Sequence, residues 1–503
     1  MSQLLLSATA GAVAELEDPH VPHAATGETT PLLTSSNGAQ SSAGATDESR
    51  IPKKQVALLC FARLIEPIAF FSVFPYINQM VQDNGSIADT DVGFYSGVIE
   101  SLFSLTQAIV MLSWGRAADR FGRKPVLVLS LIGMASATAL FGTARTLGQM
   151  IAFRCLAGVF SGTIVTIRTM LAEHSTTATQ ARVFSWFAFS GNLGIFLGPL
   201  LGGALADPLG RSSLEDGVPD TRFFAAYPYA LPGFVVAGLG FLAALLSALY
   251  IDETLVTKKA PTSSSSAQLV EETTVSEGQD LSIRHLLKSP GVAIVLYNYA
   301  HVMLLAFSYT AIVPVFWFTP VPLGGLGFTP LQISIMMGMT GAGQAVWLLF
   351  VFPPLQYRIG TNGVMRVCAI AYPVFMAVSP LASMLLRYWN APGIFWTCVP
   401  PIMVIGSGVS MCFTAVQLAV NDVAPSPQLL GTLNALALTG VSYIRAFTPA
   451  LFTSLYAVNA RTQALDGYII WVLMVLVALG YTLSARYLPD YDAIKKRRLE
   501  HQD

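Results

Sequence analysis

Twelve long apolar segments are the feature that most constrains the fold of this 503-residue chain. A helix needs about 20 mostly apolar residues to cross the hydrocarbon core of a bilayer. Segments of that length follow one another between residues 56 and 487, separated by short turns that are charged or contain Pro and Gly. Only 11% of the residues are charged, against roughly 25% in an ordinary soluble domain. The chain is therefore predicted to be an all-α membrane protein that crosses the bilayer many times.

The predicted spans fall into two sets of six around a long polar stretch. The first set covers residues 56–81, 92–114, 125–143, 147–172, 183–206 and 226–250, and the second covers 291–318, 331–354, 364–386, 393–420, 430–457 and 467–487. We therefore expect a disordered N-terminal tail, two six-helix halves joined by a flexible cytoplasmic linker, and a basic C-terminal tail. Their boundaries are 1–52, 53–251, 252–289, 290–490 and 491–503.

The distribution of positive charge predicts the orientation of the spans. Most of the 28 Lys and Arg residues lie in segments that are cytoplasmic if the N-terminus is inside. The predicted external loops hold only Arg145, Arg211, Arg222, Arg387 and Arg461. Because positive loops stay in the cytoplasm, both termini are predicted to be cytoplasmic.

Ten residues between the second and third spans, 115–124, carry five charges, four of them positive. These charges cannot lie in hydrocarbon, so we expect a tight loop that Gly115 and Gly122 allow to reverse sharply. One interpretation is a solvated turn at the lipid headgroups. The other is a gate latch, in which Asp119 and Arg120 pair with a neighbouring helix end in one conformation only, with Arg123 as a further member.

The pattern Gly-x-x-x-Asp-Arg-x-Gly-Arg-Lys resembles the signature loop of major facilitator superfamily transporters. Arg154-x-x-x-Gly158 resembles a fourth-helix motif of that family, and the first span resembles fungal members of its twelve-helix drug:H+ antiporter branch. The resemblance implies two halves with a substrate site between them near the midplane. A shortened copy of the loop, Tyr357-Arg358-Ile359-Gly360, follows the eighth span and supports an internal repeat.

The fifth span carries a motif that resembles one typical of the proton-coupled antiporters of this family. Its residues are Gly194, Gly198, Pro199, Gly202 and Gly203. Glycines four residues apart form a bare strip on a helix, which lets another helix approach closely. Pro199 interrupts the hydrogen-bond ladder and bends the helix. We expect this strip at the moving interface between the two halves, the alternative being simple helix packing.

Charged residues inside the spans are candidates for function, because each costs about 2.5–3.5 kcal/mol or more at the bilayer centre. Arg63 and Glu66 are three residues apart and share a face of the first helix. Glu66 is the leading candidate for a proton site tuned by Arg63 and Arg154, against the alternative of a permanent structural network. Arg154 and Arg168 are predicted to share a face of the fourth helix. Glu100 in the second span is a further candidate.

The second half offers fewer charged residues. His301 in the seventh span can titrate near physiological pH, although a lone His is more often a hydrogen-bonded core residue. Arg445 could bind an anionic substrate group or pair with an acid across the interface. Gln344, Gln417 and Asn434 are further candidates for substrate binding.

The leading functional prediction is a proton-coupled exporter of small organic molecules that works by alternating access as a monomer in a lipid bilayer. The alternatives are an importer or uniporter on the same fold, and a membrane sensor that does not transport. We expect no enzyme activity, because neither a metal cluster nor a nucleophile–base pair is evident, and no cofactor. The net charge of −1 gives no case for nucleic acid.

Two short patterns concern targeting and modification. Glu28 followed by Leu32-Leu33 fits an acidic dileucine sorting signal, so the vacuolar or endosomal membrane stands beside the plasma membrane as a destination. Asn84-Gly85-Ser86 is a glycosylation sequon in a predicted external loop. The five widely spaced cysteines suggest small buried hydrophobic residues rather than metal ligands.

Overall fold

The computed structural model of the protein describes residues 51–175, 179–206, 222–255, 289–424 and 427–489. These residues are helical throughout, with short turns and no strand in the described ranges, so the all-α prediction is confirmed. The two tails, the dileucine pattern and most of the linker lie outside the described residues.

The N-terminal half contains six predicted spans that fold as eight main helices and a short one. They are α2 (Lys53–Phe71), α3 (Ile77–Gly85), α4 (Val92–Phe121), α5 (Arg123–Gly142), α6 (Leu147–Val159), α7 (Thr163–Glu173), α8 (Gln180–Leu205), α9 (Arg222–Ala226) and α10 (Ala230–Tyr250). The first predicted span, 56–81, is broken between α2 and α3, where Pro75 lacks an N–H group and disfavours helix at the residue before it. The fourth span is also broken, at residues 160–162.

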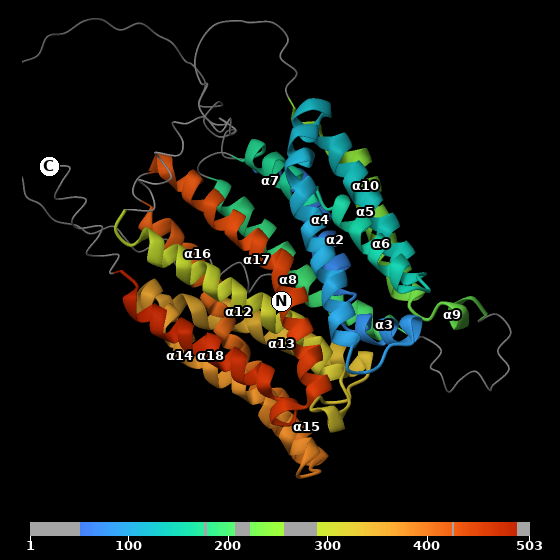
Figure 1. Ribbon diagram of the computed structural model, residues 1–503. Helices are drawn as coiled ribbons and strands as arrows, with labels where there is room; N and C mark the ends of the chain where they lie inside the picture. The colour runs from blue at the N-terminus through green and yellow to red at the C-terminus, as the bar shows by residue number, and fades with distance from the viewer. Residues whose placement is uncertain (1–50, 176–178, 207–221, 256–288, 425–426, 490–503) are drawn as a thin grey trace, which may run out of the picture. The chain divides into compact units, whose positions relative to one another are not determined.

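The C-terminal half repeats this arrangement. Its helices are α12 (Val292–Phe318), α13 (Pro330–Val346), α14 (Phe352–Arg387), α15 (Pro392–Gly406), α16 (Met411–Val423), α17 (Pro427–Thr462) and α18 (Ile469–Ser484). A π-helical turn, η3 (Trp347–Val351), joins α13 to α14. In Figure 1 the first half runs from blue to green and the second from yellow to red.

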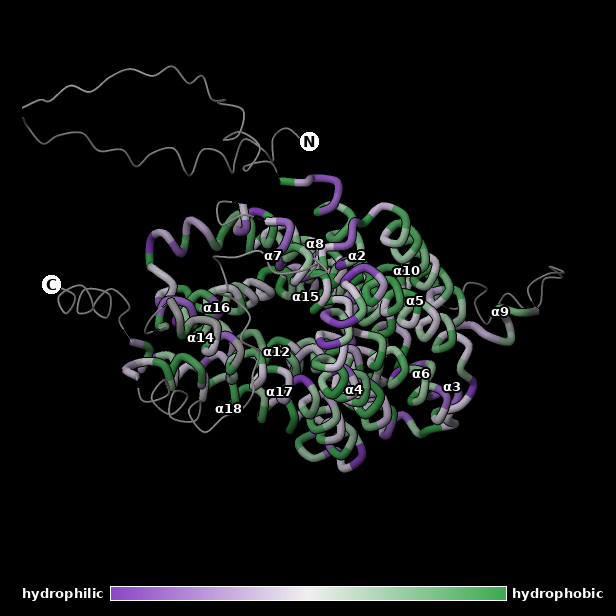
Figure 2. The backbone as a smooth tube through the Cα atoms, turned by 90° about the horizontal axis from the view of Figure 1, so that it is seen from above, coloured by the Kyte–Doolittle hydropathy of each residue, from purple (hydrophilic) through white to green (hydrophobic). Residues whose placement is uncertain are grey.

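Ten helical segments in the described ranges are long and apolar enough to cross a membrane. One of them, Pro330–Arg387, is 58 residues long and contains two predicted spans. The further predicted span is α2, which carries four charged residues among its 19. Figure 2 shows hydrophobic segments over most of the bundle, including α5, α10 and α18. The layout agrees with twelve predicted spans.

The predicted internal repeat has a backbone counterpart. Gly122 has φ 106° and ψ 150°, and Gly360, the aligned glycine of the second half, has φ 71° and ψ 171°. Both glycines interrupt otherwise continuous helix, in a region of φ/ψ space that essentially only glycine occupies. In both halves the chain therefore turns between consecutive spans at a glycine with this positive-φ conformation.

The halves meet along two helix pairs, α4 with α17 and α8 with α13. The contacts gather at the helix ends predicted to be external. There, Ala450 N–H donates to Ser101 Oγ at 2.8 Å, and Arg461 pairs with Asp91. A Cβ on Gly97 would overlap Thr453, so glycine is required for this close approach. Toward the predicted cytoplasmic ends, α4 and α17 diverge (Figure 1).

Candidate functional site

The Glu66 carboxylate is the centre of a polar cluster in the N-terminal half. Glu66 is 7% exposed. Its Oε1 accepts hydrogen bonds from Gln107 Nε2 and Ser161 Oγ, each at 2.8 Å, and its Oε2 accepts one from Thr163 Oγ1 at 2.7 Å. Arg63 Nη1 lies 3.8 Å from Oε2. Three neutral donors and one cation thus surround a single buried carboxylate, which satisfies its charge away from water.

The break in the fourth span supplies two of these donors. Ser161 lies in the turn between α6 and α7, and Thr163 is the first residue of α7. Trp114 of α4 packs over this turn and donates from Nε1 to the Val159 carbonyl at 2.6 Å. A Cβ on Gly162 would overlap the Trp114 ring. The sequence predicts one continuous helix here, and Thr163 is not identified from it. The run Ser161-Gly162-Thr163 is the signal that could have indicated a break in the helix.

Arg154 does not contact Glu66, which corrects the prediction that it tunes that acid. Its Nη2 donates to the Phe70 carbonyl at 3.1 Å, and its guanidinium lies over the rings of Phe103 and Phe141. The carboxylate that interacts with it electrostatically is Glu100, which is 4% exposed. The membrane-spanning part of this half therefore holds two separate groups of an acid with an arginine, Glu66 with Arg63 and Glu100 with Arg154.

The prediction that Arg154 and Arg168 share a helix face is also wrong, because the helix between them is broken. Arg168 is exposed on α7 and lies over the Phe187 ring at 5.5 Å from its centroid. Arg63 lies over the same ring at 5.0 Å. The break turns α7 so that Arg168 joins Arg63 instead of Arg154.

Arg445 of α17 brings the second half to this cluster. Its guanidinium lies 4.9 Å from the centroid of the Phe70 ring, and it interacts electrostatically with Glu66 and Arg63. No ion pair of Arg445 occurs among the described residues, so its pairing with an acid across the interface stays a prediction.

A chain of hydrogen bonds links polar residues of the C-terminal half. Tyr299 Oη donates to Gln417 at 3.0 Å, Gln417 Nε2 donates to Asn434 at 3.0 Å, and Asn434 Nδ2 donates to Asn421 at 3.1 Å. Gln417 and Asn434 therefore lie together, as candidates for one site. Gln344 lies on α13, the helix that packs against α8.

His301 lies at a helix contact within the C-terminal half. Its Nε2 is 2.9 Å from the Val477 carbonyl oxygen of α18, and its Nδ1 is 3.3 Å from Tyr297 Oη. A carbonyl accepts only, so Nε2 carries a proton. This arrangement favours the packing role over a part in the Glu66 cluster.

The charged segment 115–124 is mostly helical rather than a loop. α4 continues to Phe121 and α5 begins at Arg123, so that only Gly122 separates them. Because Gly122 alone supplies the reversal, the charged side chains project from helix ends. Gly115 lies within α4, and Arg120 is exposed with its guanidinium over Phe121.

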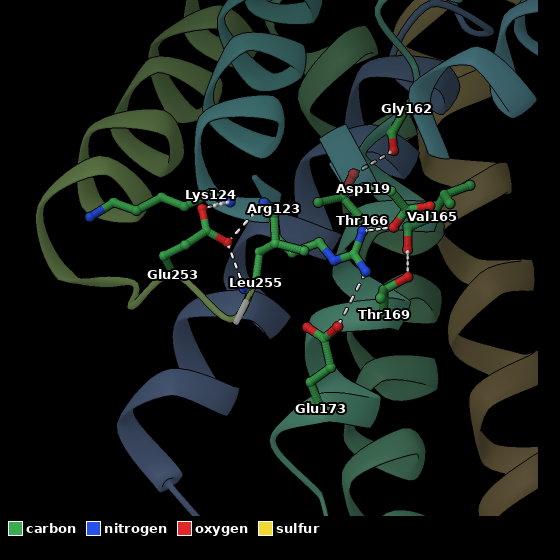
Figure 3. Close-up of polar contacts among 10 residues, drawn as sticks. All are labelled: Asp119, Arg123, Lys124, Gly162, Val165, Thr166, Thr169, Glu173, Glu253 and Leu255. Atoms are coloured by element: carbon green, nitrogen blue, oxygen red, sulfur yellow. Dashed lines mark hydrogen bonds and ion pairs between the residues drawn. The ribbon is translucent and has the colours of Figure 1, made fainter. Parts of the chain in front are cut away.

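Arg123 organises the ion pairs of this segment. Its side chain pairs with Asp119 and lies 3.3 Å from Glu173 of α7, as Figure 3 shows. Glu253, just after α10, accepts hydrogen bonds from the backbone nitrogens of Arg123 at 2.8 Å and Lys124 at 3.1 Å. Asp119 thus pairs within its own half in this conformation.

The start of the predicted linker is held in place by these contacts. Burial acts to raise the pKa of the Glu253 carboxyl, but hydrogen bonds from the backbone N–H groups of Leu255, Arg123, Lys124 and Thr254 together lower that pKa below its ordinary value. An anion at the N-terminus of α5 is also favoured by the helix dipole. Neither Glu173 nor Glu253 is identified from the sequence, because their partners are distant along the chain.

The fifth-span glycines face α2 of the same half, which corrects their predicted position between the halves. A Cβ on Gly194 would lie 2.8 Å from the Leu64 carbonyl, and one on Gly198 would lie 3.0 Å from Phe71 Cβ. A Cβ on Gly202 would overlap the Ser72 carbonyl. The motif does reach the other half through its remaining members: Ser334 of α13 donates to the Pro199 carbonyl at 2.6 Å and closely approaches Gly203.

Two further predictions concern surface chemistry. Asn84 lies near the end of α3, and its Nδ2, where a glycan would be attached, donates to the Ala144 carbonyl at 2.9 Å. Cys368 and Cys412 are buried as expected, whereas Cys398 is exposed on α15. Glycosylation of Asn84 stays a prediction.

Two halves of membrane-spanning helices with buried charged residues inside them are typical of carriers that move solutes across a bilayer. Comparisons with known proteins agree. The sequence model of the Major Facilitator Superfamily matches residues 59–449. The chain is 44% identical to the efflux pump azaK of Aspergillus niger, over 95% of this chain and 98% of that protein. It is 26% identical to the multidrug transporter mfsB of Aspergillus fumigatus, over 89% and 85% of the two chains.

A solved structure shares the fold. A bacterial homologue of the human lysosomal transporter Spinster, in an inward-facing and unoccupied conformation, matches with a TM-score of 0.60 and 15% identity, over 88% of this chain and 98% of that one. The chain belongs to the Major Facilitator Superfamily and is a secondary transporter. The predicted family and twelve-helix fold are confirmed.

Proposed function

We propose that this transporter exports small organic molecules from the cytosol in exchange for protons. The observation that carries the proposal is the Glu66 cluster, in which one buried carboxylate joins α2, α4 and the α6–α7 turn, while Arg445 of the other half lies over Phe70, one turn further along α2. The two relatives named above are described as an efflux pump and a multidrug transporter, which supports export.

The coupling follows from the charge balance of the cluster. A proton on Glu66 removes the negative charge that faces Arg63 and Arg445, so the attraction that draws α17 toward α2 is lost. Protonation therefore favours a different arrangement of the halves from the one that the charged acid favours. Asp119 is proposed to act as the cytoplasmic latch, exchanging its partner Arg123 when the cytoplasmic ends close.

The transporting unit is proposed to be one chain, since the cluster is formed by the two halves of a single molecule. Export takes place across the plasma membrane or into the vacuole. We assign no chemical reaction to the protein.

The test is proton flux in proteoliposomes that hold a pH-sensitive dye and an imposed pH gradient. Addition of an exported compound should release the gradient as protons move opposite to the compound. Movement of both in the same direction would support an importer, and solute flux without proton movement would support a uniporter. Binding without flux would favour a sensor and contradict the proposal.

A further inference from the structure

The membrane-spanning segments hold more positive than negative charge near the polar cluster. Four arginines lie within the spans there, Arg63, Arg154, Arg168 and Arg445, against two carboxylates, Glu66 and Glu100. An isolated charge inside a bilayer is costly, so such residues usually face a partner or a transported solute. An excess of arginine thus favours the binding of negative charge at this place.

Two of the four arginines have a carboxylate nearby that offsets their charge. Arg63 lies 3.8 Å from Glu66, and Arg154 interacts with Glu100. Among the ion pairs of the described residues, none involves Arg168 or Arg445. Arg445 interacts electrostatically with Glu66, but Arg63 lies beside the same carboxylate. Arg168 has Arg63, another cation, as its electrostatic neighbour.

The surroundings of these two arginines combine positive charge with aromatic rings. Arg168 and Arg63 both lie over Phe187, and Arg445 and Arg154 both lie over Phe70. Ring faces attract cations and partly offset the missing anions. Phe70 is only partly buried, so it also offers flat apolar surface beside Arg445, whereas Phe187 is buried.

Arg168 and Arg445 come from opposite halves, α7 and α17, and both remain accessible. Arg168 is exposed, and Arg445 is only partly buried. A guanidinium group presents paired N–H donors that match the two oxygens of a carboxylate. Arg63 is an electrostatic neighbour of both residues, so negative charge near Arg63 would be attracted to all three arginines and would link the halves.

We propose that Arg168 and Arg445 bind the carboxylate of an aromatic organic anion, which is the substrate class of this transporter. The inference rests on the proposed function for its transport direction, although binding can be measured independently. The apolar body of the substrate would lie against Phe70.

The proposal has an electrical consequence. Exchange of one exported monoanion for one imported proton moves two positive charges inward per cycle. Transport should therefore be accelerated by a potential that is negative on the cytoplasmic side, at a constant pH gradient. Exchange of a neutral compound for one proton moves a single charge and is less sensitive to the potential.

Binding of three probes of similar shape to the full-length purified protein tests the charge preference. The probes are 2-naphthoate, its uncharged amide 2-naphthamide, and the cation 2-naphthylmethylammonium. We expect the carboxylate to bind at least about tenfold more tightly than the amide, as charge-assisted hydrogen bonds imply. Equal binding of the amide, preference for the cation, or no binding of the carboxylate at millimolar concentration would overturn the proposal.

Variants assign the preference to residues. Arg168→Gln and Arg445→Gln should each weaken naphthoate binding about tenfold or more and leave naphthamide binding unchanged. Arg168→Lys should restore part of the loss, since the charge returns without the paired donors. Arg145→Gln is the matched control, because Arg145 is exposed over Tyr227 outside the cluster. Ligand-free thermal unfolding of each variant separates lost folding from lost binding, and unchanged naphthoate affinity in both glutamine variants would refute the assignment.

Transport then separates this inference from the function on which it rests. Selective naphthoate binding without proton-coupled flux would leave the anion site standing and refute proton-driven export. Proton-coupled flux of the amide or the cation, with naphthoate ignored, would support export and refute the anion site.

Discussion

Replacing Glu66 by Gln removes one charge from the polar cluster while nearly keeping the shape of the side chain. The amide oxygen can still accept from Gln107 and Ser161, which both reach Oε1 in the structure. The amide nitrogen takes the position of Oε2, and the Thr163 hydroxyl, which now donates to Oε2, can rotate to accept from it. Glu66→Gln therefore replaces the charge-assisted hydrogen bond from Thr163 by a neutral one and removes the charged partner of Arg63.

The change in hydrogen bonding affects mainly stability, whereas the loss of the charge affects mainly transport. A hydrogen bond to a charged group contributes about 1.5–3 kcal/mol and a neutral one about 0.5–1.5 kcal/mol, so the variant should fold with slightly lower thermal stability. Coupling should be lost altogether. With the potential held at zero and one proton per substrate, a pH difference of one unit supports up to about tenfold accumulation. We expect no accumulation by Glu66→Gln and intact exchange of substrate for substrate.

Two control variants separate charge from packing. Thr163→Val removes the Thr163 hydrogen bond and keeps the acid, so it should lose at least as much stability and retain accumulation. Glu100→Gln removes the other buried carboxylate and tests whether the effect belongs to Glu66 in particular. Full accumulation driven by the pH gradient in a stable Glu66→Gln protein would refute the reasoning and direct attention to Glu100.

Three further predictions can be tested with the same purified protein. Asp119→Asn should reduce transport strongly at normal abundance, because Arg123 loses its partner at the α4–α5 turn; normal rates would contradict the latch. Gly202→Ala should destabilise the α2–α8 contact by about 1–3 kcal/mol, whereas Gly238→Ala, where a Cβ meets nothing within 4 Å, should be tolerated; equal melting temperatures would contradict the close-packing argument. Glu253→Gln should lower thermal stability near neutral pH. Because the pKa of Glu253 is lowered by folding from an ordinary 4.5, the charged form stabilises the fold above that pH, and the contribution disappears as pH falls through the folded-state value. The difference between wild type and Glu253→Gln should therefore shrink in acid, and a difference that is constant from neutral to acid pH would contradict it.

The sequence by itself determined the class of fold and the candidates for its chemistry. Twelve apolar segments require a bilayer, since no soluble fold can bury so much apolar surface with so few charges. The cost of charge in hydrocarbon marked Glu66, Arg63 and Arg445. The repeated glycines, Gly122 and Gly360, were visible as an alignment and prove to share a backbone conformation.

Only the tertiary structure decided which candidates meet. The partners of Glu66 come from three elements, and its donor Thr163 depends on a break in the fourth span that a continuous helical pattern conceals. That same break separates Arg154 from Arg168. Arg123 pairs with Glu173 through its side chain. Its backbone N–H group donates to Glu253, which lies more than a hundred residues further along the chain. Hydrophobic patterning acts along each helix and can be read locally, whereas the pairing of buried polar groups depends on how helices cross, which the packing of all their side chains sets together.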